Sequence, residues 1–141
     1  MRISIINVII FSIIFLSNGC KKNAIKNPYL EEISFHVEIN LDLPQYESLQ
    51  YAGSAIYIPN GGIKGVFLIN NGSTILAFEA SDPNHYPNDC SKMTLNGLTC
   101  TCSCEQNKYS LSTGQPITDG LSYSMKPYHI SRNGNILSIY N

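Results

Sequence analysis

The residues with the greatest capacity for metal or redox chemistry lie between Asp82 and Gly114. This stretch contains His85 and every cysteine that follows residue 20, namely Cys90, Cys100, Cys102 and Cys104. Imidazole nitrogens and thiolates are ligands of zinc and of iron–sulfur clusters. In an oxidising compartment, an even number of cysteines equally predicts at least one disulfide. Four cysteines allow three complete pairings, and the sequence alone does not choose among them.

The N-terminus indicates the compartment. Arg2 precedes an almost wholly apolar stretch, residues 3–16, which is shorter than the ~20 residues of a membrane span and is typical of a signal peptide. The sequence Leu16-Ser17-Asn18-Gly19-Cys20 then resembles a bacterial lipobox. We expect residues 1–19 to be a signal peptide, Cys20 the lipidation site, residues 20–31 a lipidated tether and residues 32–141 the domain. The alternatives are ordinary signal peptidase cleavage and an uncleaved anchor.

The mature chain expected from this cleavage, residues 20–141, has the size of one domain and carries little charge. Charged residues make up 13% of the sequence, against about 25% in typical proteins. Loss of Arg2 leaves eight basic and ten acidic residues, a net charge of −2. There is no basic face, so nucleic acid is not an expected partner. The expected partners are a membrane, through the lipid anchor, and an unidentified protein or ligand of the bacterial cell envelope.

The elements that must position the candidate residues are short strands. Apolar and polar residues alternate without a break from Ile33 to Leu41, which predicts a strand with one buried face and with His36 facing outward. Residues 43–51 are compatible with one helical turn at most. Further strands are predicted at residues 55–58, 66–69, 74–78, 94–95, 98–99, 128–130 and 136–140, separated by turn signals such as Asn96-Gly97. This pattern predicts an all-β sandwich or barrel.

The order and spacing of the pieces between residues 62 and 140 resemble a Rieske iron–sulfur domain. Rieske domains hold a [2Fe–2S] cluster by two Cys on one iron and two His on the other, in the patterns C-x-H and C-x-x-H. His85 and Cys102 fall at the positions of the first His and the second Cys. Residues 107–114 resemble the strand and turn after the second ligand loop, and they set this register. The resemblance implies a Rieske-like antiparallel sandwich or barrel with a small cluster-binding-type subdomain.

In this register, two of the four ligands are replaced. Pro83 stands where the first Cys belongs, and Glu105, a hard oxygen donor, stands where the second His belongs. We therefore expect no cofactor, and a binding or structural module of the cell envelope rather than an enzyme. One alternative is electron transfer through a [2Fe–2S] cluster. The other is a mononuclear zinc site that joins His85 and Cys102 to Asp82, Glu105 or Cys100.

The resemblance also implies a disulfide pairing. Some Rieske domains carry a disulfide between the two ligand loops, and its positions correspond to Cys90 and Cys104 here. Closing a loop of about 15 residues would stabilise the fold by about 3 kcal/mol. Cys100 is expected to be a small buried hydrophobe. His85, if it binds no metal, is expected to be a loop histidine hydrogen-bonded to the backbone.

Overall fold

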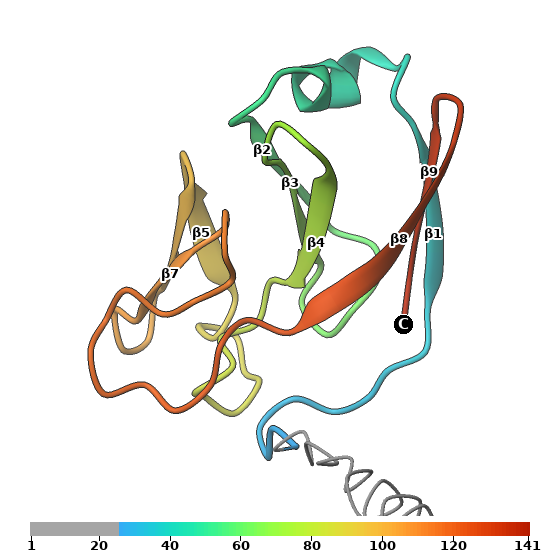
Figure 1. Cartoon of the computed structure of the whole chain (residues 1–141). Coiled ribbons are helices and arrows are strands. Elements are labelled where there is room, and N and C mark those ends of the chain that lie inside the picture. The colour runs from blue at the N-terminus through green and yellow to red at the C-terminus, as the bar shows by residue number, and fades with distance from the viewer. Residues whose placement is uncertain (1–25) are drawn as a thin grey trace, which may run out of the picture.

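The structure is a computed structural model that describes residues 26–141. The expected signal peptide, Cys20 and the first part of the expected tether lie outside the described residues. The described chain forms strands and a single 3-10 helix, arranged as Figure 1 shows. In chain order these elements are β1 (His36–Asn40), η2 (Pro44–Gln50), β2 (Ala55–Ile58), β3 (Val66–Asn70), β4 (Ile75–Glu79), β5 (Met93–Asn96), β6 (Thr99–Cys102), β7 (Lys108–Ser110), β8 (Pro127–Asn133) and β9 (Ile136–Tyr140).

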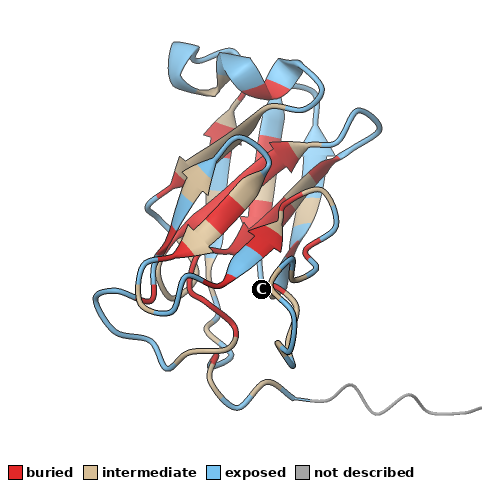
Figure 2. Cartoon of the chain, turned by 90° about the vertical axis from the view of Figure 1, so that its left-hand side faces the viewer, coloured by how far each residue is buried: buried red, intermediate tan, exposed pale blue. Residues whose placement is uncertain are grey.

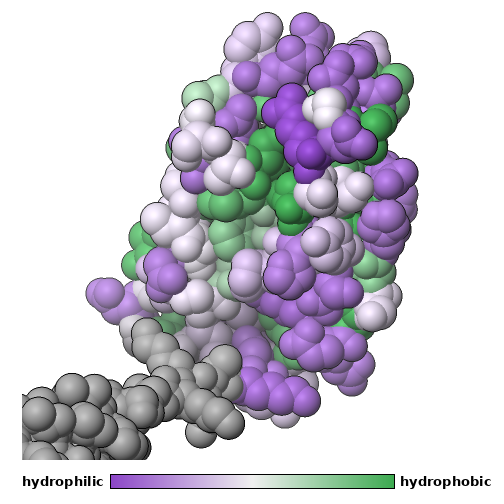
Figure 3. Space-filling view, turned by 45° about the vertical axis from the view of Figure 1, so that its right-hand side comes forward, coloured by the Kyte–Doolittle hydropathy of each residue, from purple (hydrophilic) through white to green (hydrophobic). Residues whose placement is uncertain are grey.

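The strands form two antiparallel sheets, which confirms the predicted all-β antiparallel class. The larger sheet has the order β1-β9-β8-β4-β3-β2, and the smaller has the order β5-β6-β7. β4 and β8 pair through only two residue pairs, Ala77 with Tyr128 and Phe78 with Pro127. The larger sheet turns at this short junction into a half-barrel (Figure 1). On the face in Figure 3, apolar side chains reach the surface in the upper half, with polar side chains around them.

Two hydrophobic cores lie on opposite faces of β3 and β4. Val66 and Leu68 point into the core inside the half-barrel, whereas Phe67 and Ile69 point into the core beneath the smaller sheet. All four side chains are buried, and Figure 2 shows the buried residues gathered along the strands. A strand that is covered on both faces needs apolar residues at every position. This explains why residues 66–69 form a continuous apolar run.

The local predictions hold for the first strand but not for the helix. Ile39 and Leu41 are buried and His36 is exposed, as the alternation predicts. The expectation of at most one helical turn within residues 43–51 is wrong, since η2 continues for seven residues. η2 begins at Pro44, and proline is suited to the first turn of a helix because the N–H that it lacks would have no partner there. The one buried side chain of η2 is Leu49.

The described part of the expected tether packs against the domain. The Asn27 side chain donates a hydrogen bond of 2.8 Å to the Pro83 carbonyl, and Leu30 is only 3% exposed. The Tyr29 ring meets the Tyr86 ring edge-on, with centroids 4.9 Å apart. In the described part of the chain, no helix has the length and the apolar character needed to cross a membrane.

A buried carboxylate closes the end of β4, and the sequence gives no sign of it. Glu79 is fully buried, and it accepts hydrogen bonds from the backbone N–H groups of Ile63, Lys64 and Ser81 at 2.7–2.9 Å. The Tyr128 hydroxyl donates a further hydrogen bond of 2.5 Å. Burial and this carboxylate both raise the pKa of Tyr128. Glu79 therefore fastens the turn before β3 to the start of the first cysteine-bearing loop.

Candidate functional site

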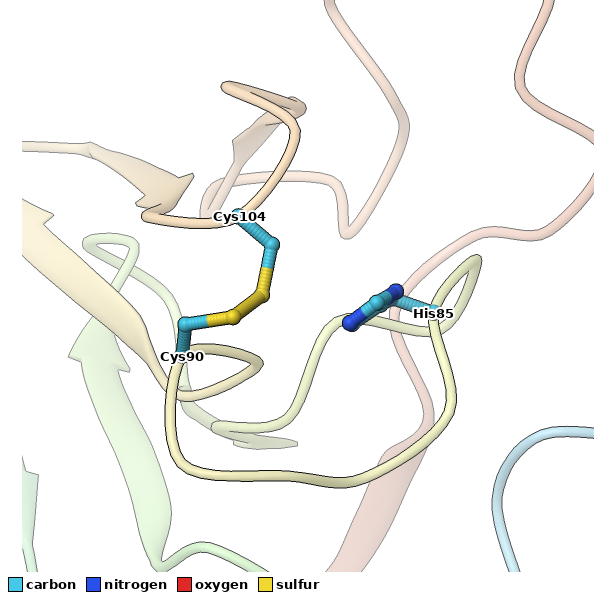
Figure 4. Close-up of side chains that lie close together, drawn as sticks. All are labelled: His85, Cys90 and Cys104. Carbon is cyan, nitrogen blue, oxygen red and sulfur yellow. A yellow bond between two sulfur atoms is a disulfide. The ribbon is translucent and has the colours of Figure 1, made fainter.

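Three loops meet at the end of the molecule where the described chain begins (Figure 1). The first, residues 80–92, follows β4; the second, residues 103–107, joins β6 to β7; the third, residues 111–126, joins β7 to β8. A disulfide between Cys90 and Cys104 links the first two loops, with Cα atoms 5.3 Å apart. This is the pairing that the Rieske resemblance implies. Figure 4 shows that the His85 imidazole extends toward this disulfide from the other side of the first loop.

Side chains, not the backbone, hold the His85 imidazole. Its Nδ1 lies 3.4 Å from the Glu105 carboxylate, and its Nε2 lies 3.0 Å from the Asn88 side-chain nitrogen. The Asn88 amide orientation is set by its oxygen, which accepts from the backbone N–H groups of Cys90 and Ser91. Its NH₂ group therefore donates to Nε2, which leaves the imidazole proton on Nδ1, facing Glu105. The expected backbone hydrogen bond of the imidazole is thus replaced by two side-chain partners.

Both free cysteines, Cys100 and Cys102, are buried. Cys102 is fully buried, and its thiol donates a weak hydrogen bond of 3.7 Å to the Cys90 carbonyl. Burial raises the pKa of Cys102, with the N–H groups of Glu105 and Cys104 opposing the shift. Cys100 packs in the core beneath the smaller sheet, where burial raises its pKa to about 12. In the metal-free protein, burial therefore favours the protonated thiol at both positions.

Asp82, an alternative metal ligand, is turned into the protein. Its carboxylate is fully buried and accepts from the Tyr109 hydroxyl at 2.5 Å, from the Asn107 side chain at 2.9 Å and from the Asn84 N–H at 2.8 Å. Burial and the hydrogen bond to Asp82 both raise the pKa of Tyr109. The carboxylate thus has three internal donors and helps to fill the space between the loops.

Asn84 ties the third loop to this network. Its side-chain oxygen accepts from the N–H groups of Ser122 and Tyr123, each at 3.0 Å. Its nitrogen donates to the Tyr109 hydroxyl at 2.9 Å and to the Tyr123 carbonyl at 2.7 Å. Asn84 therefore uses its full hydrogen-bonding capacity to join the first and third loops. Sequence reasoning missed both Asn84 and Asn88, because asparagine between turn residues is read as ordinary loop composition.

The residues present do not match the ligand set of a [2Fe–2S] cluster. Of the positions that the resemblance aligns, only His85 and Cys102 carry cluster-type donors, and Pro83 carries none. Within residues 26–141, potential metal-ligating atoms lie within 4.8 Å of one another in His85, Cys90 and Cys104. Cys102 does not belong to this cluster. The two sulfurs of the cluster are bonded to each other. Every buried side-chain nitrogen and oxygen of the described chain has a hydrogen-bond partner. No buried nitrogen or oxygen is therefore unpaired in a way that would indicate a missing cofactor.

No family model and no curated protein matches this sequence. Among solved structures, a complex of reduced oxygenase and oxidised ferredoxin in carbazole 1,9a-dioxygenase is 12% identical, with a TM-score of 0.49 over 74% of this chain and 92% of the other. The ferredoxin of carbazole 1,9a-dioxygenase from Nocardioides aromaticivorans IC177 is 13% identical, with a TM-score of 0.44 over 65% and 90%. A Sphingomonas yanoikuyae B1 ferredoxin is 11% identical, with a TM-score of 0.45 over 64% and 88%. At these values the similarities assign no ligand and no activity to this chain.

Proposed function

We propose that this chain is an exported, lipid-anchored protein of the bacterial cell envelope whose Rieske-like domain, in its disulfide-bonded form, is a cofactor-free binding or structural module. The observation that carries the proposal is the environment of Asp82. The carboxylate next to the position of the replaced cysteine is buried and receives three internal hydrogen bonds. In this arrangement, the space between the loops is occupied by the protein's own polar groups.

The links between the loops need no cofactor. The Cys90–Cys104 disulfide joins the first loop to the second, and Asn84 joins the first loop to the third. The scaffold that would surround a cluster is therefore kept rigid by other means.

A binding role has a candidate surface beside these loops. A cavity of about 300 Å³ is lined by side chains of the N-terminal segment and the first loop, among them Tyr29 and Tyr86, and by Ile63 from the turn before β3. Tyr86 is 66% exposed and is held by its edge-on contact with Tyr29. Tyrosine combines a large apolar ring with a polar hydroxyl, which suits a surface that contacts a partner.

Metal content and the visible spectrum test the proposal directly. The untagged full chain would be purified aerobically in detergent, without chelators, and assayed for iron, acid-labile sulfide and zinc. We expect less than stoichiometric metal and no visible absorbance. Two irons and sulfide per chain, with visible absorbance, would refute the cofactor-free state and make electron transfer the function. Stoichiometric zinc without iron would also refute the cofactor-free state and would support a mononuclear metal site in place of a cluster.

The lipid anchor is tested separately. Membrane fractionation of cells that express wild-type chain or Cys20→Ser should place the wild type with the membranes and the variant in the soluble fraction. Mass spectrometry of the N-terminal peptide should show a diacylated or triacylated Cys20. An unmodified Cys20, or equal distribution of the two proteins, would contradict the anchor but leave the cofactor-free proposal intact.

A further inference from the structure

The close-up of the first and second loops shows three side chains with metal-ligating atoms at one point. A nitrogen of His85 and the sulfurs of Cys90 and Cys104 all lie within 4.8 Å of one another. Figure 4 shows the imidazole reaching across the mouth of the first loop toward the two sulfurs. Cys90 is exposed, and His85 and Cys104 are half-buried, so both a small reductant and a metal ion can reach the cluster from solvent.

The disulfide prevents metal binding at this point, and its reduction would remove the block. A dithiol reductant supplies two electrons and two protons, breaks the Cys90–Cys104 bond, and is itself oxidised to a disulfide. Binding of a divalent cation then displaces the two thiol protons and leaves two thiolates on the metal. The 5.3 Å between the two Cα atoms keeps both thiols within reach of a common ion.

The distances among the three ligand atoms suit an ion with tetrahedral coordination. Zn–S bonds of about 2.3 Å and Zn–N bonds of about 2.0–2.1 Å place tetrahedral ligand atoms about 3.6–3.8 Å apart. The imidazole nitrogen already lies within 4.8 Å of both sulfurs. Side-chain rotations of the two cysteines, together with a rotation of the Asn88 side chain out of the space between them, would bring the three ligands to one ion.

The histidine already has the tautomer that a metal ligand needs. Its Nδ1–H faces the Glu105 carboxylate at 3.4 Å, and its Nε2 lone pair accepts from Asn88 at 3.0 Å. A carboxylate on the remote N–H is the usual partner of a metal-ligating histidine, since it orients the ring and increases its basicity. The Asn88 oxygen lies 3.3 Å from the Cys90 sulfur and 3.6 Å from the Cys104 sulfur. Asn88 thus fills the space where the ion would sit, and it must turn aside for the ion to enter.

We propose that reduction of the Cys90–Cys104 disulfide converts this loop pair into a binding site for one thiophilic divalent cation of the Zn²⁺ class, held by Cys90, Cys104 and the Nε2 atom of His85. The fourth position is open to water. The site differs from the mononuclear site considered from the sequence, because it uses the loop cysteines and not Cys102. It forms only in the reduced protein and does not depend on the lipid anchor.

Cobalt titration tests the proposal, with Co²⁺ as a spectroscopic probe of thiolate ligation. The full chain would be reduced anaerobically with dithiothreitol, freed of reductant, and titrated beside the oxidised chain. We expect one Co²⁺ per reduced chain, with tetrahedral d–d bands and a thiolate charge-transfer band that Zn²⁺ abolishes. The oxidised chain should give neither band. Far-ultraviolet circular dichroism of the reduced chain should retain its β-sheet spectrum.

Matched variants separate this site from other ligands. His85→Ala should weaken cobalt binding by more than about tenfold. His36→Ala removes an exposed strand histidine and should leave binding unchanged. Cys100→Ala and Cys102→Ala should also retain binding, since neither cysteine belongs to the cluster. A reduced chain without stoichiometric cobalt, equal affinity of His85→Ala and wild type, loss of binding in Cys102→Ala, or loss of the β-sheet spectrum on reduction would each overturn the proposal.

Discussion

Replacing Tyr109 by phenylalanine tests whether the polar network between the loops is a real source of stability. The Tyr109 side chain is fully buried, and its hydroxyl is the only group that this substitution removes. That hydroxyl donates to the Asp82 carboxylate at 2.5 Å and accepts from the Asn84 amide at 2.9 Å. The ring keeps its place in the core, so the substitution isolates the two hydrogen bonds.

The expected loss of stability is the sum of the contributions of these two hydrogen bonds. A hydrogen bond to a charged group contributes about 1.5–3 kcal/mol, and an unsatisfied buried N–H costs about 1–3 kcal/mol. Asp82 keeps its donors from Asn84 and Asn107, and the Asn84 amide keeps the Tyr123 carbonyl, so both terms fall toward the lower ends of their ranges. We expect Tyr109→Phe to lower the free energy of unfolding by about 3 kcal/mol.

Urea denaturation followed by circular dichroism, with the disulfide intact, measures this difference. The matched control is Tyr51→Phe, which removes the hydroxyl of a side chain that is 63% exposed and should change stability by less than about 0.5 kcal/mol. The denaturant slope should be the same for both variants and wild type. A loss below about 1 kcal/mol for Tyr109→Phe, at an unchanged slope, would refute the view that the network stabilises the loops.

The pH dependence gives a second readout of the same residue. Burial, reinforced by the Asp82 hydrogen bond, raises the pKa of Tyr109 in the folded protein above its value of about 10 in the unfolded chain. The stabilisation is therefore complete below about pH 10. Above that pH it falls by at most about 1.4 kcal/mol per pH unit, because the unfolded tyrosine loses its proton first. Above about pH 10, the free energy of unfolding of Tyr109→Phe should fall less steeply with pH than that of wild type. Equal slopes for the two proteins would contradict a raised pKa of Tyr109 in the folded state.

The remaining predictions concern the disulfide, one glycine and the second buried tyrosine. Replacing Cys90 and Cys104 together by alanine should cost about 3 kcal/mol, measured as a shift in the urea midpoint, and an unshifted midpoint would contradict it. Gly114→Ala should destabilise more than Gly97→Ala: both have positive φ, but a Cβ at Gly114 would lie 2.7 Å from a core ring, whereas one at Gly97 would meet nothing within 4 Å. Equal melting temperatures would refute this difference. Tyr128→Phe removes a hydrogen bond to a buried carboxylate and should cost about 1.5–3 kcal/mol, with a flatter stability profile above about pH 10. An unchanged profile would argue against burial as the cause of its raised pKa.

The strands and the general class of fold could be predicted from the sequence because they depend on local patterns. The alternation from Ile33 to Leu41 identifies one buried face, and Asn96-Gly97 marks the hairpin between β5 and β6. The length of η2 could not be predicted in the same way. Its residues show little helical periodicity, and the tertiary contact of Leu49 with the core inside the half-barrel holds them in place.

The candidate site was harder to predict, because its decisive contacts join residues that are distant in the sequence. Asp82 stands out in the sequence only as an alternative metal ligand, and nothing near it indicates burial. Tyr109 and Asn107, which donate to its carboxylate, are brought to it by the return of β7. Glu79 is equally inconspicuous, and its partner Tyr128 lies 49 positions away. Neither residue has a local signal that would distinguish burial from exposure. Hydrogen-bond partners of this kind become visible only when the topology is known.

Under the proposed lipid anchor, the packed N-terminal segment is the place where a mechanical load would enter the domain. Asn27 accepts from the N–H groups of Tyr29 and Leu30 and donates to the Pro83 carbonyl, while Lys126 reaches back to Glu32. Tension on the chain ahead of residue 26 would pull on these contacts one after another, before it reached either sheet. The segment would then detach before either core unfolds, because its contacts bear the load first. Once released, residues 26–32 could span at most about 25 Å, so the link between a lipid anchor and the folded domain would be extensible.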